Sequence, residues 1–139
     1  MINRARWAVL ALAAGLTVAA CSPGAAATQP PNLEGTKWRV VEIGGAPTYG
    51  ANPPTVSFGN GRIRGDSGCN TFSANLKMDQ TAIDVGSINS TLRLCEGDVG
   101  AIETQFMRAL VGATSFAFDA EGKLVLDGDG GAVQLIAAR

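Results

Sequence analysis

The feature that most limits the fold of this chain is its division, from Leu33 onward, into short apolar or alternating runs separated by glycine, asparagine and aspartate. Runs of this length between turn-forming residues are typical of an antiparallel β-sheet. In "FGNGR", Asn60 and Gly61 stand where a tight hairpin turn requires positive φ. We expect strands at residues 37–43, 55–58, 62–65, 70–78, 82–85, 90–94, 115–119, 123–127 and 132–137.

One segment, "DVGAIETQFMRALVG" at residues 98–112, departs from this pattern. Its apolar residues recur at the intervals of three and four that predict an amphipathic helix: Val99, Ile102, Phe106 and Leu110. Asp98 is expected to cap the start of the helix, and Gly112 to follow its end. A single helix cannot bury its apolar stripe alone. The sequence therefore predicts an α+β domain in which a curved, partly closed antiparallel β-sheet wraps around one α-helix.

The first twenty residues have the composition of a signal peptide. Arg4 and Arg6 precede an apolar run at residues 7–20, which is shorter than the roughly 20 residues that a membrane-spanning helix needs. The run leads into "VAAC", which resembles the lipobox of bacterial lipoproteins, where the cysteine, here Cys21, becomes the lipidated N-terminus. The alternative is an ordinary secretory signal cleaved near Ala20, with Cys21 incidental.

We therefore expect three parts: a lipoprotein signal peptide at residues 1–20, a disordered tether at 21–32 and a folded domain at 33–139. The tether is small, polar and proline-containing. Of the 11 lysine and arginine residues two lie in the signal peptide, which leaves nine against 12 acidic residues. This balance argues against a nucleic-acid partner. The expected membrane contact is the lipid, in the cell envelope. In the lipoproteins that this segment resembles, a residue other than aspartate after the cysteine, here Ser22, implies the periplasmic face of the outer membrane if the cell is Gram-negative.

With Cys21 assigned to the lipid, Cys69 and Cys95 remain as an even pair in an exported domain. The usual state of such a pair is a disulfide. Closing the loop between them stabilises the fold by about 3 to 4 kcal/mol. The alternatives are two reduced buried thiols, or a redox or catalytic role, although no CxxC spacing or histidine is present to activate a thiolate. We expect no metal and no other cofactor, because further soft ligands for zinc are lacking.

The absence of histidine from the chain excludes the Ser-His-Asp triad and the common zinc hydrolase sites. A carboxylate pair such as Asp66 with Glu103 remains a candidate, but no spacing singles it out. We expect a binding or scaffold protein, whose partner is another envelope protein or an apolar ligand held between helix and sheet. The alternative is a carboxylate-dependent envelope enzyme of unrecognised type.

Several motifs follow one another along the folded part: "LEGTKW" at residues 33–38, "GDSGCNTF" at 65–72, "STLRLC" at 90–95, the helix with Glu103, and "LVL" at 124–126. In this order they resemble the META domain family over residues 33–136. That family includes a heat-inducible bacterial envelope lipoprotein linked to novobiocin resistance and a virulence-associated protein of trypanosomatid parasites. The resemblance implies a curved sheet around a helix and a part in envelope stress or antibiotic tolerance, without implying a biochemical activity.

The residues around Cys69 also have a physical interpretation. Gly68 can adopt a backbone conformation closed to other residues, and the side chain of Asn70 can bond to neighbouring backbone groups. Together they are expected to hold a bend that presents Cys69 inward.

Three further motif residues are interpreted as structural. Trp38 and Phe72 belong to the expected core, and Thr91 is expected to be a buried hydroxyl with a backbone partner. The chain departs from the family before Cys95, where Leu92, Arg93 and Leu94 replace a common methionine and alanine. One apolar set replaces another, so the expected pairing of the cysteines is unaffected.

Overall fold

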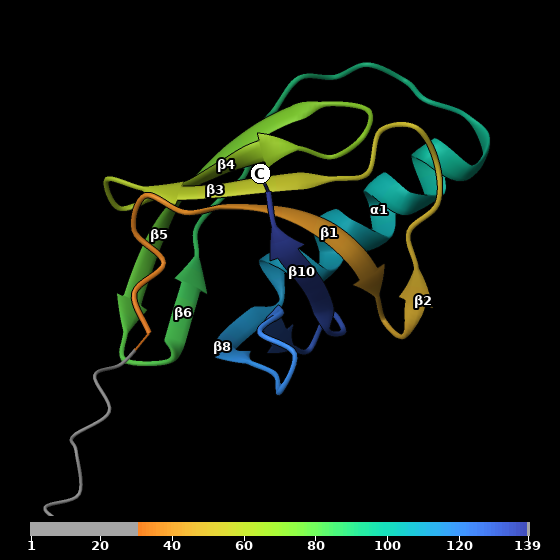
Figure 1. Ribbon diagram of the computed structural model, residues 1–139. Coiled ribbons are helices and arrows are strands. Elements are labelled where there is room, and N and C mark those ends of the chain that lie inside the picture. Colours follow the sequence, from red (N-terminus) through yellow and green to blue (C-terminus); the bar gives the residue numbers. More distant parts are fainter. Residues whose placement is uncertain (1–30, 139) are drawn as a thin grey trace, which may run out of the picture.

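The computed structural model describes residues 31–138. Figure 1 shows a curved β-structure with one helix. The elements are β1 (Lys37–Ile43), β2 (Ala46–Pro47), β3 (Thr55–Gly59), β4 (Arg62–Asp66), β5 (Thr71–Asp79), β6 (Ala82–Val85), β7 (Asn89–Ser90), α1 (Gly97–Val111), β8 (Ala113–Phe118), β9 (Leu124–Gly128) and β10 (Val133–Ala137). Eight of the nine predicted strands and the helix are present within two residues of their predicted bounds, and the short strand β2 was not predicted.

Eight strands form a closed antiparallel barrel in the order β1, β3, β4, β5, β6, β8, β9, β10 and back to β1. The closing pair, β1 with β10, extends from Trp38↔Ala137 to Ile43↔Val133. The two shortest strands lie outside the ring, β2 on β1 and β7 on β5. The expectation of a partly closed sheet is corrected: the barrel closes, and the fold is mostly β with one helix. Closure pairs both edges of each of these eight strands, which would otherwise present unpaired backbone groups.

The inward-facing residues of the barrel and one face of α1 share a single hydrophobic core. From α1 it includes Phe106, Ala109 and Leu110, all fully buried. The opposite face of the helix is exposed at Thr104 and Arg108. The barrel therefore curves around one face of the helix, which crosses behind β1 in the view of Figure 1.

The helix ends differ partly from the prediction. The N-cap residue is Glu96, and it makes no side-chain capping bond. Asp98 does not cap the helix but lies in its first turn, where a carboxylate is still favourable because it faces the positive end of the helix dipole. At the other end Gly112 follows the helix as predicted, and its N–H donates to the carbonyl of Arg108 at 3.0 Å.

The predicted strand at residues 90–94 is wrong. Strand β7 ends at Ser90, and the chain from Thr91 to the helix has no regular structure. The alternation of apolar and polar residues in "TLRLC" suggested a strand. Alternation shows that two sets of side chains face opposite ways, but it does not show which set faces the core.

Candidate functional site

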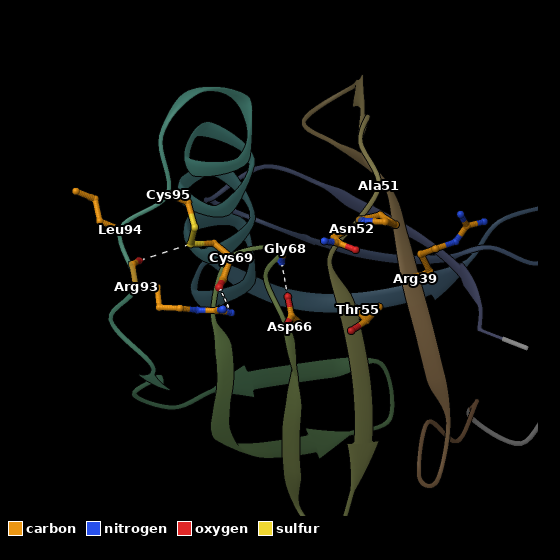
Figure 2. Close-up of a pocket in the computed structure, with 11 residues that line it drawn as sticks. Arg39, Ala51, Asn52, Thr55, Asp66, Gly68, Cys69, Arg93, Leu94 and Cys95 are labelled. Atoms are coloured by element: carbon orange, nitrogen blue, oxygen red, sulfur yellow. Dashed lines mark hydrogen bonds between the residues drawn. A yellow bond between two sulfur atoms is a disulfide. The ribbon is translucent and has the colours of Figure 1, made fainter.

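The surface feature that most needs explaining is the segment of residues 91–95, which we call the pinned segment. Its first, third and fifth residues bond to the body of the protein. Its second and fourth, Leu92 and Leu94, are 96% and 90% exposed. An ordinary surface strand buries its apolar set and exposes its polar set, so the pinned segment has the reverse arrangement. In Figure 2 the side chain of Leu94 points away from the protein.

Asn70 holds the backbone of the pinned segment. Its Oδ1 accepts the N–H of Arg93 and the hydroxyl of Thr91, both at 2.8 Å. Its Nδ2 donates to the carbonyl of Arg93 at 3.0 Å and to Oε1 of Glu103 at 2.9 Å. Asn70 is only 3% exposed, so these bonds replace those that water would make. One side-chain amide thus takes the place of a neighbouring strand.

A disulfide and a bend complete the support. Cys69 and Cys95 are joined, with their Cα atoms 6.1 Å apart, as the sequence predicted. Gly68 has a φ of +90°, and a Cβ at this position would lie 2.8 Å from the carbonyl oxygen of Asn52, so the bend requires glycine. The N–H of Gly68 donates to Oδ1 of Asp66 at 2.7 Å. The bend buries Cys69, which is 2% exposed.

Trp38, Phe72 and Thr91 are the remaining motif residues of the sequence prediction. Trp38 is buried in the core, and Phe72 packs edge to face on Phe106 with ring centroids 5.6 Å apart. The hydroxyl of Thr91 accepts the N–H of Thr71 at 3.2 Å, which is a backbone partner. Thr91 itself is exposed, so its expected burial is wrong. Its hydroxyl lies at the edge of the fold because the chain leaves the sheet after Ser90.

Several hollows flank the pinned segment, one of them over the start of α1. The first of two others, of about 640 Å³, is lined about equally by polar and apolar atoms and lies beside the disulfide. Figure 2 shows that its arginines do not converge, because Arg93 is directed at the carbonyl of Cys69 and Arg39 extends away from Asp66. The second is an apolar groove of about 420 Å³ between the pinned segment and α1. The apolar residues lining this groove are Ile88, Leu92, Leu94, Met107 and Val111.

Comparison with family models matches residues 31–139 to the META domain. The chain belongs to the META domain family. The resemblance inferred from the sequence motifs is thereby confirmed.

Two solved structures share the fold of this META domain. An NMR structure of a protein from Burkholderia xenovorans is 19% identical, covers 76% of this chain and 83% of its own, and has a TM-score of 0.61. A crystal structure of a DUF4847 family protein from Bacteroides vulgatus is 18% identical, covers 74% of this chain and 92% of its own, and has a TM-score of 0.54. At these identities the likeness establishes the fold alone. No curated protein matches the chain.

The candidate carboxylate pair of the META domain is divided between the two hollows. Asp66 lines the hollow beside the disulfide, Glu103 lines the apolar groove, and neither of these hollows contains both. Each carboxylate also bonds within the fold: Asp66 accepts the N–H of Gly68, and Oε1 of Glu103 accepts the hydroxyl of Ser67 at 2.6 Å. The structure therefore gives these two residues no shared site.

Sequence reasoning missed two features of the META domain. Ser67 is fully buried, and its hydroxyl links Glu103 to the bend before Asn70. The outward direction of Leu92 and Leu94 was missed too, because the alternation in residues 91–95 does not show which set of side chains faces the core.

Within residues 31–138, no cluster of three histidine, cysteine, aspartate or glutamate side chains is placed to hold a metal ion. In the same part of the chain no helix has the length and apolar character needed to cross a membrane. Cys21, the predicted signal peptide and most of the predicted tether lie outside the described residues.

Proposed function

We propose that this protein is a lipid-anchored binding or scaffold module of the cell envelope that contributes to tolerance of envelope stress and of antibiotics such as novobiocin. The observation that carries the binding function is the pinned segment, which holds Leu92 and Leu94 in solvent on a support of buried hydrogen bonds and a disulfide. Large exposed apolar side chains on a fixed support favour association, because little conformational entropy remains to be lost on binding.

Of the two partners expected from the sequence, we favour a protein over an apolar ligand held between helix and sheet. The space between α1 and the barrel is occupied by packed side chains, among them Phe106, Leu124 and Leu135, each 0% exposed. Among the described residues, one apolar surface that remains open is the groove beside the pinned segment.

Site-specific photo-crosslinking in living cells tests this function. A photo-reactive residue at Leu92 is expected to capture one reproducible envelope protein. The same residue at Tyr49, which is 76% exposed and does not line the groove, serves as the control. Identical adducts from both positions, or none from Leu92, would contradict the proposal.

The anchor is supported by the "VAAC" sequence and is tested separately. Mass spectrometry of the mature protein is expected to show a diacylated or triacylated Cys21, and Cys21→Ala is expected to release the protein from the membrane fraction. An N-terminal Ser22, or an unmodified Cys21, would contradict lipid anchoring.

The part in antibiotic tolerance is supported by membership of the META domain family. Deletion of the gene is expected to increase sensitivity to novobiocin and to envelope stress. Wild-type protein should restore tolerance, whereas a Leu92→Ser, Leu94→Ser variant should not. If that variant restores tolerance, tolerance does not depend on the exposed leucines of the pinned segment.

A further inference from the structure

The backbone N–H and C=O groups of the pinned segment alternate in direction from one residue to the next, as its side chains do. The N–H of Thr91 donates to the carbonyl of Thr71 at 3.1 Å, and the N–H of Arg93 donates to Oδ1 of Asn70 at 2.8 Å. These two groups therefore point toward the body of the protein. In an extended chain the next residue directs its N–H and C=O to the opposite side.

Leu92 and Leu94 consequently direct their backbone groups outward. Among residues 31–138, neither the N–H nor the C=O of either leucine has a hydrogen-bond partner within the protein. The outer side of the pinned segment is thus a short open β-edge, although it belongs to no sheet. An open edge of this kind pairs readily with another extended chain.

We propose that the outer edge of the pinned segment binds an extended, apolar and basic strand of a partner protein by β-strand addition. This inference rests on the proposed binding function and specifies the partner's chemistry. Main-chain hydrogen bonds to Leu92 and Leu94 supply the pairing, and alternate side chains of the added strand supply specificity.

The groove between the pinned segment and α1 receives those alternate side chains. It lies directly beside the edge and is lined by both leucines together with Ile88, Met107 and Val111. Val111 is 56% exposed in the unbound protein. The side chains that enter the groove are therefore apolar.

The negative charge near Leu94 favours a basic residue in the added strand. Glu96 and Asp98 are exposed just beyond Leu94, and Glu103 lines the groove. The cation closest in sequence, Arg93, donates to the carbonyl of Cys69. A lysine or arginine of the partner complements these carboxylates. A second copy of the exported chain, with nine basic against 12 acidic residues, offers less complementarity than a basic segment.

The test uses the full-length exported protein and a terminally blocked peptide, Lys-Val-Thr-Val-Thr-Val-Lys. At saturating peptide the amide hydrogens of Leu92 and Leu94 are expected to exchange at least about tenfold more slowly, while that of Arg93, already bonded, changes little. A Leu92→Ser, Leu94→Ser variant should bind about tenfold more weakly, because its apolar anchors are lost. Tyr49→Ser removes an exposed aromatic side chain elsewhere and should bind as wild type does.

A second peptide separates strand addition from simple apolar adhesion. N-methylation of all the valine and threonine amides preserves the side chains but removes the main-chain donors of both edges of the peptide, so this peptide is expected to lose binding. Equal binding by the methylated peptide, unchanged exchange at both leucines, or no binding up to about 1 mM would overturn strand addition. A dimer that depends on the two leucines in sedimentation experiments would overturn it in favour of a second copy.

The two proposals fail in different ways. If the photo-reactive residue at Leu92 captures a partner but the peptide does not bind or compete, the binding function stands and strand addition is wrong. If neither experiment shows an interaction, both are wrong.

Discussion

Asn70 connects more parts of this protein than any other polar side chain in the site. Its amide bonds to both backbone groups of Arg93, to the hydroxyl of Thr91 and to the carboxylate of Glu103. The sequence predicted that Asn70 would bond to neighbouring backbone groups. It did not indicate that these groups would come from a segment more than twenty residues further along the chain.

At the residue scale we predict that Asn70→Ala lowers the free energy of unfolding by about 2 to 4 kcal/mol, because four part-buried hydrogen bonds of a buried side chain are lost. Urea denaturation measures the change. Asn89→Ala is the matched control, since Asn89 is exposed and forms no side-chain hydrogen bond within the described residues. A loss below about 1 kcal/mol for Asn70→Ala would show that water replaces these bonds at little cost.

At the scale of elements, the pinned segment differs from the strands around it. A strand is held by a ladder along its whole length, whereas this segment is held by the amide of Asn70, the disulfide and a few further bonds to Cys69 and Thr71. The ladder of β4 with β5, in contrast, runs from Arg62↔Asn75 to Asp66↔Thr71. Removing the amide or the disulfide should therefore loosen the segment while the barrel keeps its pairing.

We predict that a Cys69→Ser, Cys95→Ser variant loses about 3 to 4 kcal/mol of unfolding free energy, as expected for a cross-link that restrains the unfolded chain. The amide hydrogen of Leu76 in β5, whose exchange requires unfolding of the barrel, should exchange faster by the factor that this loss of stability gives, and that of Arg93 should also exchange faster because the segment opens locally. Urea denaturation and hydrogen exchange measure the two effects. Unchanged exchange at Arg93 would mean that Asn70 alone holds the segment.

At the scale of the whole molecule, the barrel has one weak seam. Strands β6 and β8 share the single aligned pair Ala82↔Ser115, with one further bond from the N–H of Phe116 to the carbonyl of Thr81 at 2.8 Å. Every other junction of the ring has at least three aligned pairs. Local opening should begin where the fewest bonds must break.

We predict that the amide hydrogen of Phe116 exchanges about tenfold or more faster than that of Leu76, although their hydrogen bonds are similar in length, at 2.8 and 2.9 Å. Native-state exchange followed by NMR measures both amides. Equal rates would show that the barrel opens only as one unit.

Much of the fold was accessible from the sequence. The turn at Asn60 and Gly61, with φ of 55° and 65°, is determined by these residues themselves. The spacing of Phe106 and Leu110 along the chain likewise places both on one face of the helix. The pairing of Cys69 with Cys95 followed from their number and context. These features depend on neighbours in the chain, which a single sequence displays.

Three features were decided only by the tertiary structure: the closure of the barrel through β1 with β10, the outward direction of Leu92 and Leu94, and the joining of Ser67, Asn70 and Glu103 by hydrogen bonds. Each depends on which distant segments meet. An alternating sequence pattern shows that successive side chains face opposite sides. Only the neighbours that pack against the segment determine which of the two sets is buried. The sequence by itself thus determined the elements and the family, and the meeting of distant elements decided where the protein presents an apolar edge.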